Sequence, residues 1–492
     1  MVKTAVILAA GYGSRINGSG KGMPKPLIPV VGMPLLRRVI LTAKRAGIKR
    51  CVVVIGHESD RVRKVMEADS VVSEMTEFVV NDEFDRANGV SLLKAQEVVG
   101  DEPFVLLMGD HLFESATLTE LMSLATAPGE CVLAVDRKLD TIVDMDDATK
   151  VQLRGGNIGN LAKELNRFDA VDSGMFLGNR SLFEAMEQAV SQGREGLSDG
   201  VRILARAGRL KAFDIGDGKW QDVDTPEMLS AARNMLFSSL VSSTSGIVSR
   251  HINRKISVAI SRLLVHTPLT PNLISLSTLV AGLLAAYYIA QPGYWNLVLG
   301  GLLFQTASVV DGCDGEIARL KFLESERGQW LDTLIDYTTD VAFLVGITWR
   351  MFAVSGLAWV APLGAVAMVL TVAYVAVMLT YSASQGSGDG NAFNNAFKNQ
   401  VKARGENLVN RAINLGRMLL KHDVTAMAIC LAAIVNIPWA IYWGMIVGNS
   451  VAFVGVISGA VMLAKKQGMR LSGTPGDKLA QPVAETVRGS RT

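Results

Sequence analysis

The stretch Asp311-Gly-Cys-Asp314-Gly-Glu-Ile-Ala-Arg319, followed by Asp332 and Asp336, decides the fold of the second half of this chain. Within each pair of aspartates the spacing is three or four residues, so each pair lies on one face of a helix. The first pair ends a long apolar run, and the second pair begins the next. Carboxylates beside hydrocarbon are costly and usually functional, and hard divalent cations prefer oxygen ligands of this kind. The stretch therefore predicts a metal site at the ends of two membrane helices.

Two simpler interpretations compete with a metal site. Acids at helical spacing usually form a solvated face, and acids within a membrane can line a proton path. A solvated face does not fit beside apolar runs of this length, and a proton path has no need of Gly315, Ala318 and Gly328. Small residues at those positions let a ligand or a second helix approach closely, which favours a site that holds a ligand.

The same residues resemble the signature of the CDP-alcohol phosphotransferase family, D-x2-D-G-x2-A-R-x8-G-x3-D-x3-D, at every fixed position. In that family two metal ions lie between the carboxylates and the diphosphate of a CDP-alcohol. The resemblance implies metal ligands at Asp311, Asp314 and Asp332. It makes Asp336 a further member of the metal cluster and the general base on the acceptor hydroxyl. The residues that it places around the nucleotide are Gly315, Ala318 and Arg319.

Composition divides the chain into two parts. Its 492 residues are too many for one ordinary domain, and a content of 49% hydrophobic and 19% charged residues predicts that part of it lies in a membrane. Residues 1–237 mix charged and apolar residues, whereas uncharged runs dominate between Pro271 and Ala464. The four cysteines have neither disulfide nor zinc spacing, so we expect reduced, structural thiols. The N-terminus lacks the features of a signal peptide.

The first part predicts an α/β domain. Strand-like apolar runs alternate with helical segments such as Pro34–Ala46, which favours a mostly parallel sheet. The expected strands are Ala5–Ala9, Cys51–Ile55, Phe104–Met108 and Val132–Val135. Glycines directly after the first strand let backbone N–H groups turn toward a phosphate chain, and Arg15 and Lys25 would add charge-assisted contacts.

The run L-A-A-G-x-G-S-R, with K-P-L after it, resembles the nucleotide-binding signature of the sugar-phosphate nucleotidyltransferases. The resemblance implies a Rossmann-like nucleotidyltransferase domain in which a substrate phosphate attacks the α-phosphate of a nucleoside triphosphate. Such a reaction needs in-line placement and charge neutralisation, for which Arg15 and Lys25 are the catalytic candidates. The nucleotide-binding residues that the signature implies are Gly11, Gly13, Ser14, Arg15 and Lys25.

Four further motifs resemble those of that family. The resemblance makes Asp110, at the end of a buried strand, the first magnesium ligand, and it favours Asp224 over Asp222 as the second. Gly89 and Ser91, in Asn88-Gly-Val-Ser91, fall where the family's base-reading loop lies. Asp172-Ser-Gly174 resembles the region that contacts the phosphorylated substrate. For the last three motifs, a simple turn is the competing interpretation.

The second part predicts an all-α polytopic membrane domain of about six spans. A linker and an interfacial amphipathic helix occupy residues 238–265, with a plain connecting helix as the alternative; the membrane domain covers 266–466, and 467–492 form a disordered tail. The expected spans are Leu273–Ala290, Tyr294–Val310, Asp332–Trp349, Leu357–Tyr381, Val424–Ile437 and Ile441–Ala464. The fifth is short, so a re-entrant element is the alternative. We expect a mobile loop at 386–395.

Basic residues indicate the orientation. They gather at 319–327, at 398–421 and after Ala464, whereas the opposite connections carry at most Arg350. The positive-inside rule then places the N-terminal domain and both active sites in the cytoplasm.

Two catalytic modules on one chain suggest sequential steps. Their order resembles the bifunctional family that joins an inositol-1-phosphate cytidylyltransferase to a di-myo-inositol phosphate phosphate synthase. That resemblance implies transfer of CMP from CTP to a polyol phosphate, myo-inositol 1-phosphate, and then transfer of the polyol phosphate from the CDP-alcohol to a second inositol 1-phosphate. It implies Mg²⁺ at both sites, with Mn²⁺ as the alternative. Membrane lipid is an expected partner, nucleic acid is not, and a homodimer is left open.

Three alternatives remain at this stage. In the first alternative, the acceptor of the second step is a lipid and the product is a phospholipid. Alternatively, the first domain is a degenerate regulatory module on an active membrane enzyme, although intact Arg15, Lys25, Asp110 and Asp224 oppose this. A transporter with a nucleotide-sensing domain is the third.

Overall fold

The computed structural model describes residues 2–17, 22–241, 248–384, 393, 396 and 421–471. The chain separates into two compact units. The first contains residues 1–241 with two short pieces, 265–267 and 320–322, and the second contains the remainder. The mobile loop predicted at 386–395 and the disordered tail predicted at 467–492 lie almost entirely outside the described residues.

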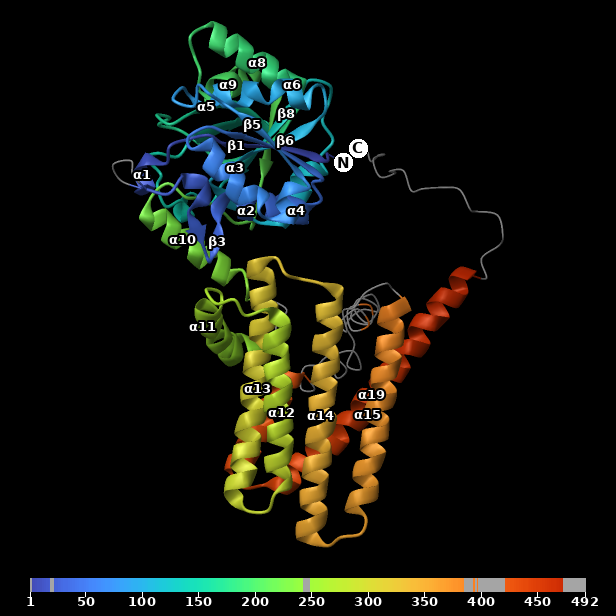
Figure 1. The fold of residues 1–492 in the computed structure, drawn as a ribbon. Helices are drawn as coiled ribbons and strands as arrows, with labels where there is room; N and C mark the ends of the chain where they lie inside the picture. Colours follow the sequence, from blue (N-terminus) through green and yellow to red (C-terminus); the bar gives the residue numbers. More distant parts are fainter. Residues whose placement is uncertain are drawn as a thin grey trace. The chain divides into compact units, whose positions relative to one another are not determined.

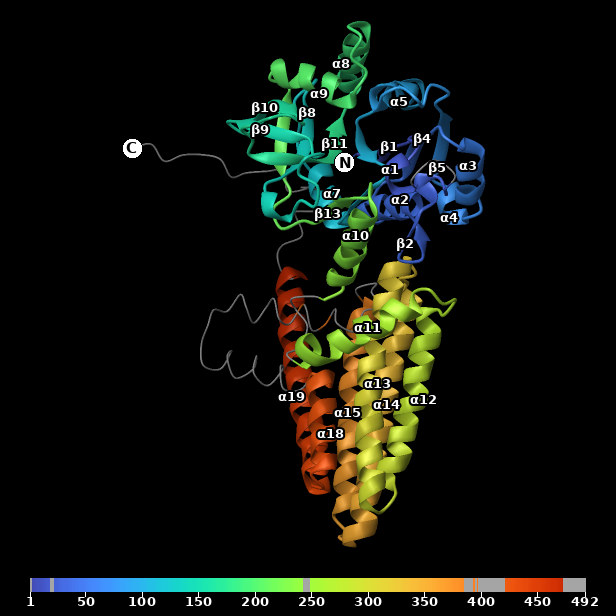
Figure 2. The same ribbon diagram turned by 90° about the vertical axis from the view of Figure 1, so that its left-hand side faces the viewer.

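A nine-stranded sheet forms the centre of the first unit (Figures 1 and 2). All four predicted strands are present in it, as β1, β4, β6 and β8. In spatial order the strands are β5 (Thr76–Val80), β4 (Arg50–Ile55), β1 (Thr4–Ala9), β6 (Phe104–Met108), β11 (Ala170–Gly178), β8 (Cys131–Asp136), β12 (Leu210–Asp214), β10 (Asn157–Ala162) and β9 (Lys150–Arg154).

The prediction of a mostly parallel sheet is wrong: of the eight neighbouring strand pairs, four are parallel, β8 with β12 among them, and four are antiparallel. β5, β4, β1 and β6 are parallel to one another, but β11 runs antiparallel to both β6 and β8, and β10 runs antiparallel to β9 and β12. For the pair β9 and β10, the reason is the length of the connection. A parallel pair needs a crossover of a dozen or more residues, whereas β9 and β10 are joined by the two glycines Gly155 and Gly156 alone.

Helices cover both faces of this sheet. In Figure 1, α2 (Leu35–Ala46) and α4 (Ser70–Ser73) lie on one side, and α5 (Asn88–Lys94), α8 (Arg180–Ser191) and α9 (Leu197–Arg206) lie on the other. The central strands are apolar on both faces, as this arrangement requires; β1 and β8 are buried along their whole length. The other short elements of the unit are α1 (Ser14–Asn17), η1 (Lys25–Leu27), β2 (Pro29–Val30), β3 (Met33–Pro34), α3 (Ser59–Glu67), α6 (Gln96–Val99), β7 (His111–Phe113), α7 (Ser115–Met122), η2 (Leu139–Thr141), β13 (Trp220–Asp222) and α10 (Pro226–Ser238).

A small second ribbon brings late residues to the end of the main sheet. β7 follows β6 directly and pairs antiparallel with β13, so that His111 lies opposite Asp222. The pairing places the segment around Asp222 and Asp224, which is more than a hundred residues away in sequence, beside Asp110.

The second unit is helical (Figures 1 and 2). α14 packs along α12, and α15 packs against α19. The elements are η3 (Ser249–Asn253), α11 (Arg254–Leu264), α12 (Pro271–Ala290), α13 (Tyr294–Lys321), α14 (Glu326–Ser355), α15 (Val360–Ser384), α18 (His422–Ile434) and α19 (Pro438–Leu471).

Within the described residues, four helices are long and apolar enough to cross a membrane: α12, α13, α15 and α19. α14 has the length, but its first half carries Asp332, Asp336 and Asp340. α18 has only 13 residues, fewer than the roughly 20 that a span needs. The predicted count of about six spans therefore stays a prediction.

Two candidate active sites

The first site is a cavity of ≈550 Å³ at the carboxyl ends of β1 and β6. Its size is that of an ordinary small-ligand site. The lining comes from the glycine loop after β1, from the segments after β6 and β13, and from 142–149 and 172–176. Among the predicted residues, those that line it are Gly11, Gly13, Arg15, Lys25, Asp110, Asp172, Gly174, Asp222 and Asp224. Ser14 begins α1 beside them.

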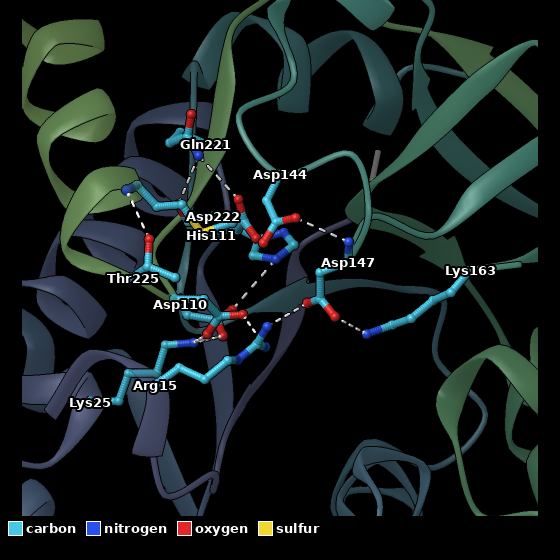
Figure 3. A network of polar contacts seen from close by, with 12 residues as sticks. Arg15, Lys25, Asp110, His111, Asp144, Asp147, Lys163, Gln221, Asp222 and Thr225 are labelled. Atoms are coloured by element: carbon cyan, nitrogen blue, oxygen red, sulfur yellow. Dashed lines mark hydrogen bonds and ion pairs between the residues drawn. The ribbon is translucent and has the colours of Figure 1, made fainter. Parts of the chain in front are cut away.

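Gly13 makes room for Lys25. Its backbone has a φ of +64°, and a Cβ at this position would lie 2.5 Å from the Cβ of Lys25. Any other residue would both strain the loop and displace the lysine. Lys25 itself is only 8% exposed and forms an ion pair with Asp110 (Figure 3). It forms a second ion pair with Asp224.

The electrostatics keep Lys25 and Asp110 charged. Burial would raise the pKa of Asp110, but the adjacent charge of Lys25 outweighs it and holds this pKa at about 2. Burial likewise opposes the charge on Lys25, and the two carboxylates overcome it and raise its pKa. Burial, with the negative charges of Asp110 and Asp224, raises the pKa of Asp222. Three carboxylates around one cation are a donor set that fits a hard divalent metal.

Arg15 belongs to a second set of ion pairs, which sequence patterns did not reveal. It contacts Asp147 at 2.6 Å and Asp224 at 2.5 Å, and Asp147 also pairs with Lys163. Figure 3 shows Asp147 between the two cations. Because both cations line the cavity, they are placed to contact a polyphosphate, and Asp147 neutralises them in the absence of one.

The region of Asp172 lies against the same wall. Burial raises the pKa of Asp172 to about 6, although the backbone N–H of Gly174 donates to its carboxylate at 2.7 Å. The ring nitrogen Nδ1 of His111 lies 3.0 Å from the carbonyl oxygen of Ser173. His111, a neighbour of three carboxylates, was also absent from the predicted set.

Gly89 and Ser91 are placed differently from the other predicted nucleotide residues. Both are buried in α5: a Cβ on Gly89 would meet Met186 and the backbone of Glu195, and the Ser91 hydroxyl accepts from Asn81 at 3.0 Å. The neighbouring Arg86 and Asn88 line the cavity instead. A base-reading role for Gly89 and Ser91 stays a prediction.

The second site lies between α13 and α14. It contains Asp311 and Asp314 from α13 and Asp332 from α14, whose carboxylate oxygens all lie within 4.8 Å of one another. One buried oxygen of Asp311 and one of Asp332 have no hydrogen-bond partner. Unpaired oxygens at this separation are costly without a cation, so this cluster fits a metal.

The structure adds groups that steer these carboxylates. The hydroxyl of Ser275, from α12, donates to Asp314 at 2.5 Å, and the backbone N–H of Gly315 donates to it as well. The fully buried Glu316 accepts from Arg254 at 2.8 Å and from Ser257 at 2.6 Å, which fixes α11 on α13. Neither partnership could be read from the spacing of acids alone.

The remaining predicted residues of this site lie on the same two helices, outside the group of three converging carboxylates. Gly315 is exposed, with nothing within 4 Å of a Cβ built on it, and its carbonyl accepts from Nε of Arg319 at 3.1 Å. Ala318 lies on the same helix, half-buried. Asp336 lies one turn beyond Asp332 and is outside the group whose oxygens converge.

Comparison with known proteins agrees with this division. The family model described as "MobA-like NTP transferase domain" matches residues 5–209, and the model described as "CDP-alcohol phosphatidyltransferase" matches residues 268–448. A curated protein of Rubrobacter xylanophilus, named "Bifunctional IPC transferase and DIPP synthase", is 37% identical over 70% of this chain and 76% of its own length. The chain belongs to this bifunctional family. A protein of the same name from Aquifex aeolicus is 33% identical over 71% of this chain and 78% of its own length.

Among solved structures, the inositol-1-phosphate CTP transferase from T. maritima matches with a TM-score of 0.43 and 22% identity, covering 47% of this chain and 96% of that one. The family membership confirms the predicted enzyme class, a nucleotidyltransferase domain followed by a CDP-alcohol phosphotransferase domain. Four apolar helices in the second domain agree with a membrane protein.

Proposed function

We propose that the first site transfers CMP from CTP to a polyol phosphate. An oxygen of the polyol phosphate attacks the α-phosphorus, the bond to the bridging oxygen breaks, and pyrophosphate leaves. Lys25 and Arg15 neutralise the negative charge that gathers on the triphosphate. Asp110 and Asp224 would hold Mg²⁺, with Mn²⁺ as the alternative, and a bound ion supplies further charge neutralisation at the phosphates.

The second site uses the product of the first. The acceptor hydroxyl attacks the phosphorus that carries the polyol, the diphosphate bridge breaks, and CMP leaves. Asp336 takes the proton of that hydroxyl, while Asp311, Asp314 and Asp332 would hold the metal that polarises the diphosphate. Gly315, with open space above it, leaves room for the nucleotide beside Ala318 and Arg319.

One observation supports the proposal most strongly: a single chain holds two separate carboxylate sites, one at a cavity that Arg15, Lys25 and Lys163 line and one with unpaired oxygens between helices. A merely regulatory first domain has no need of the charged arrangement of Lys25, Asp110 and Asp224. The names of the curated relatives support inositol 1-phosphate as the polyol and a second inositol 1-phosphate as the acceptor.

A lipid acceptor is the second candidate. A groove of ≈480 Å³ runs between α12 and α14 and is almost wholly apolar, with Leu273, Leu276, Leu334 and Ile335 in its walls. It shares α14 with Asp332 and Asp336, and an acyl chain fits such walls. Product analysis separates the two candidates, because a phospholipid product extracts into organic solvent and a doubly phosphorylated inositol product does not.

The arrangement at the membrane is part of the proposal. Six spans would include α14 and the short α18. The functional parts are the nucleotidyltransferase domain at 1–237, the linker with its interfacial helix at 238–265 and the membrane domain at 266–466. The basic connections lie in the cytoplasm. α11 supports an interfacial role, because Arg254 and Ser257 face α13 while Ile256 and Leu263 are exposed at 47% and 75%.

The test is to incubate the purified full chain with labelled CTP, Mg²⁺ and a panel of polyol phosphates, and then to identify the products. The proposal expects pyrophosphate with a CDP-alcohol, followed by CMP and a phosphodiester. Pyrophosphate release that is independent of any polyol phosphate would contradict it.

A further inference from the structure

Asp340 extends the line of acids on α14 by one more turn. Asp332, Asp336 and Asp340 recur every four residues and therefore share one face of the helix. The first two belong to the site already described. Asp340 lies deeper in an otherwise apolar stretch, where an unpaired carboxylate would be costly.

The partner of Asp340 comes from another helix. His422, the first residue of α18, places Nδ1 3.3 Å from a carboxylate oxygen of Asp340. The imidazole also packs against the ring of Phe304, 5.4 Å between centroids, and Phe304 in turn contacts Phe343 at 4.3 Å. The ring of Phe304, itself held by Phe343, and one carboxylate thus fix the orientation of the imidazole.

Through Asp340, His422 lies on the face of α14 that carries the acids of the site. Asp340 is one helical turn beyond Asp336 on that face, so the imidazole packs against the same row of carboxylates. Asp311 and Asp314 are on α13, Asp332 and Asp336 are on α14, and His422 adds a third helix.

We propose that His422 and Asp340 form a positioning pair for Asp336, the carboxylate that receives the proton of the acceptor hydroxyl. The inference rests on the proposed function of the second site. Asp340 fixes the ring of His422, and the ring provides a dipolar or cationic neighbour that holds the Asp336 carboxylate toward the acceptor, apart from the metal cluster. Neither residue touches the substrate.

The test uses the full chain in detergent, supplied with CDP-inositol and inositol 1-phosphate so that the first site is not needed. The variants are His422→Gln, Asp340→Asn and the double variant, and CMP release is measured. We expect kcat to fall about 10–100-fold in each variant, as for other residues that orient an active group. The KM for CDP-inositol should stay within twofold of wild type, and so should the Mg²⁺ concentration that gives half-maximal thermal stabilisation. The kcat of the double variant should be no lower than that of the more impaired single variant, because both residues act through one pair.

Arg350→Gln is the matched control. Arg350 lies on α14, ten residues beyond Asp340, and is a buried charged residue that donates to the carbonyls of Gln291 and Gly293. Its replacement should lower the stability of the protein and leave kcat unchanged. A kcat within twofold of wild type in His422→Gln, or equal losses in the control, would overturn the inference. If His422→Gln does not fold, Asp340→Asn decides in the same way. No CMP release by the wild type with any CDP-alcohol would instead refute the proposed function.

Discussion

Replacing Lys25 by methionine tests the charge arrangement of the first site. Methionine keeps most of the apolar stem but leaves Asp110 and Asp224 without the cation between them. Removing one partner of a fully buried ion pair costs about 3–5 kcal/mol. Because 32% of the Asp110 side chain is exposed and water screens it, we expect the free energy of unfolding to fall by about 2–3 kcal/mol.

Mg²⁺ should reverse most of that loss. A divalent ion on the two carboxylates replaces the missing charge, and a ligand at a hundredfold excess over its Kd adds about 2.7 kcal/mol. In the wild type the gain should be smaller, since the ion must compete with Lys25. CMP transfer in the variant should still fall about 10²–10³-fold, because Lys25 no longer contacts the developing charge on the phosphates.

Trp220 makes the measurement direct. It is the only tryptophan of residues 1–241 in the sequence, and its indole N–H donates to Asp136 at 2.9 Å beside the site. Urea unfolding of a fragment containing residues 1–241 is therefore followed by tryptophan fluorescence, with and without Mg²⁺, and Lys44→Met on the exposed face of α2 is the control. If Lys25→Met and Lys44→Met lose equal stability, or if Mg²⁺ stabilises both equally, the reasoning is wrong.

Further predictions concern both sites. Asp336→Asn should lower CMP release about 10²–10⁴-fold and preserve the stabilisation of the protein by Mg²⁺. Asp332→Asn should abolish the stabilisation by Mg²⁺ and raise stability in EDTA, because it removes one of three converging carboxylates. Loss of Mg²⁺ stabilisation in Asp336→Asn and its retention in Asp332→Asn would exchange the two roles. Burial raises the pKa of Asp172 to about 6, so its contribution to stability is complete below about pH 4 and is lost as the pH rises through about 6; Asp172→Asn should flatten this part of a pH–stability curve. An impermeant thiol reagent on intact cells should label a cysteine replacing Gln291 and spare one replacing Leu323, and equal labelling would contradict the proposed orientation.

The sequence was sufficient for the parts of the fold whose signals are local. The strand before Gly11 and the strand before Asp110 are short apolar runs followed at once by the residues that line the cavity, so strand and site were predicted together. In the second unit, three- and four-residue spacings alone brought Asp311 and Asp314 to one face of a helix. The convergence of both with Asp332 was predicted from the position of the two pairs at the ends of successive apolar runs, and the resemblance then assigned the roles.

Contacts between distant segments were not predictable in this way. Asp147 reaches Arg15 across 132 residues of sequence, and nothing in its own neighbourhood marks it. The antiparallel β10 was missed because the alternation of strands and helices was read as uniform, although the two-residue connection between β9 and β10 carries the opposite signal. His422 had a weak signal: it is a lone histidine beside a long apolar run.

The central claim is that one chain carries two independent transfer sites that act in sequence. The most direct measurement follows two variants of the full chain, Asp110→Asn and Asp332→Asn, with CTP, inositol 1-phosphate and Mg²⁺, and separately with CDP-inositol in place of CTP. The account predicts that Asp110→Asn makes no CDP-inositol but releases CMP from supplied CDP-inositol at the wild-type rate. It predicts that Asp332→Asn accumulates CDP-inositol and releases no CMP. Loss of both reactions together in either folded variant would contradict the account.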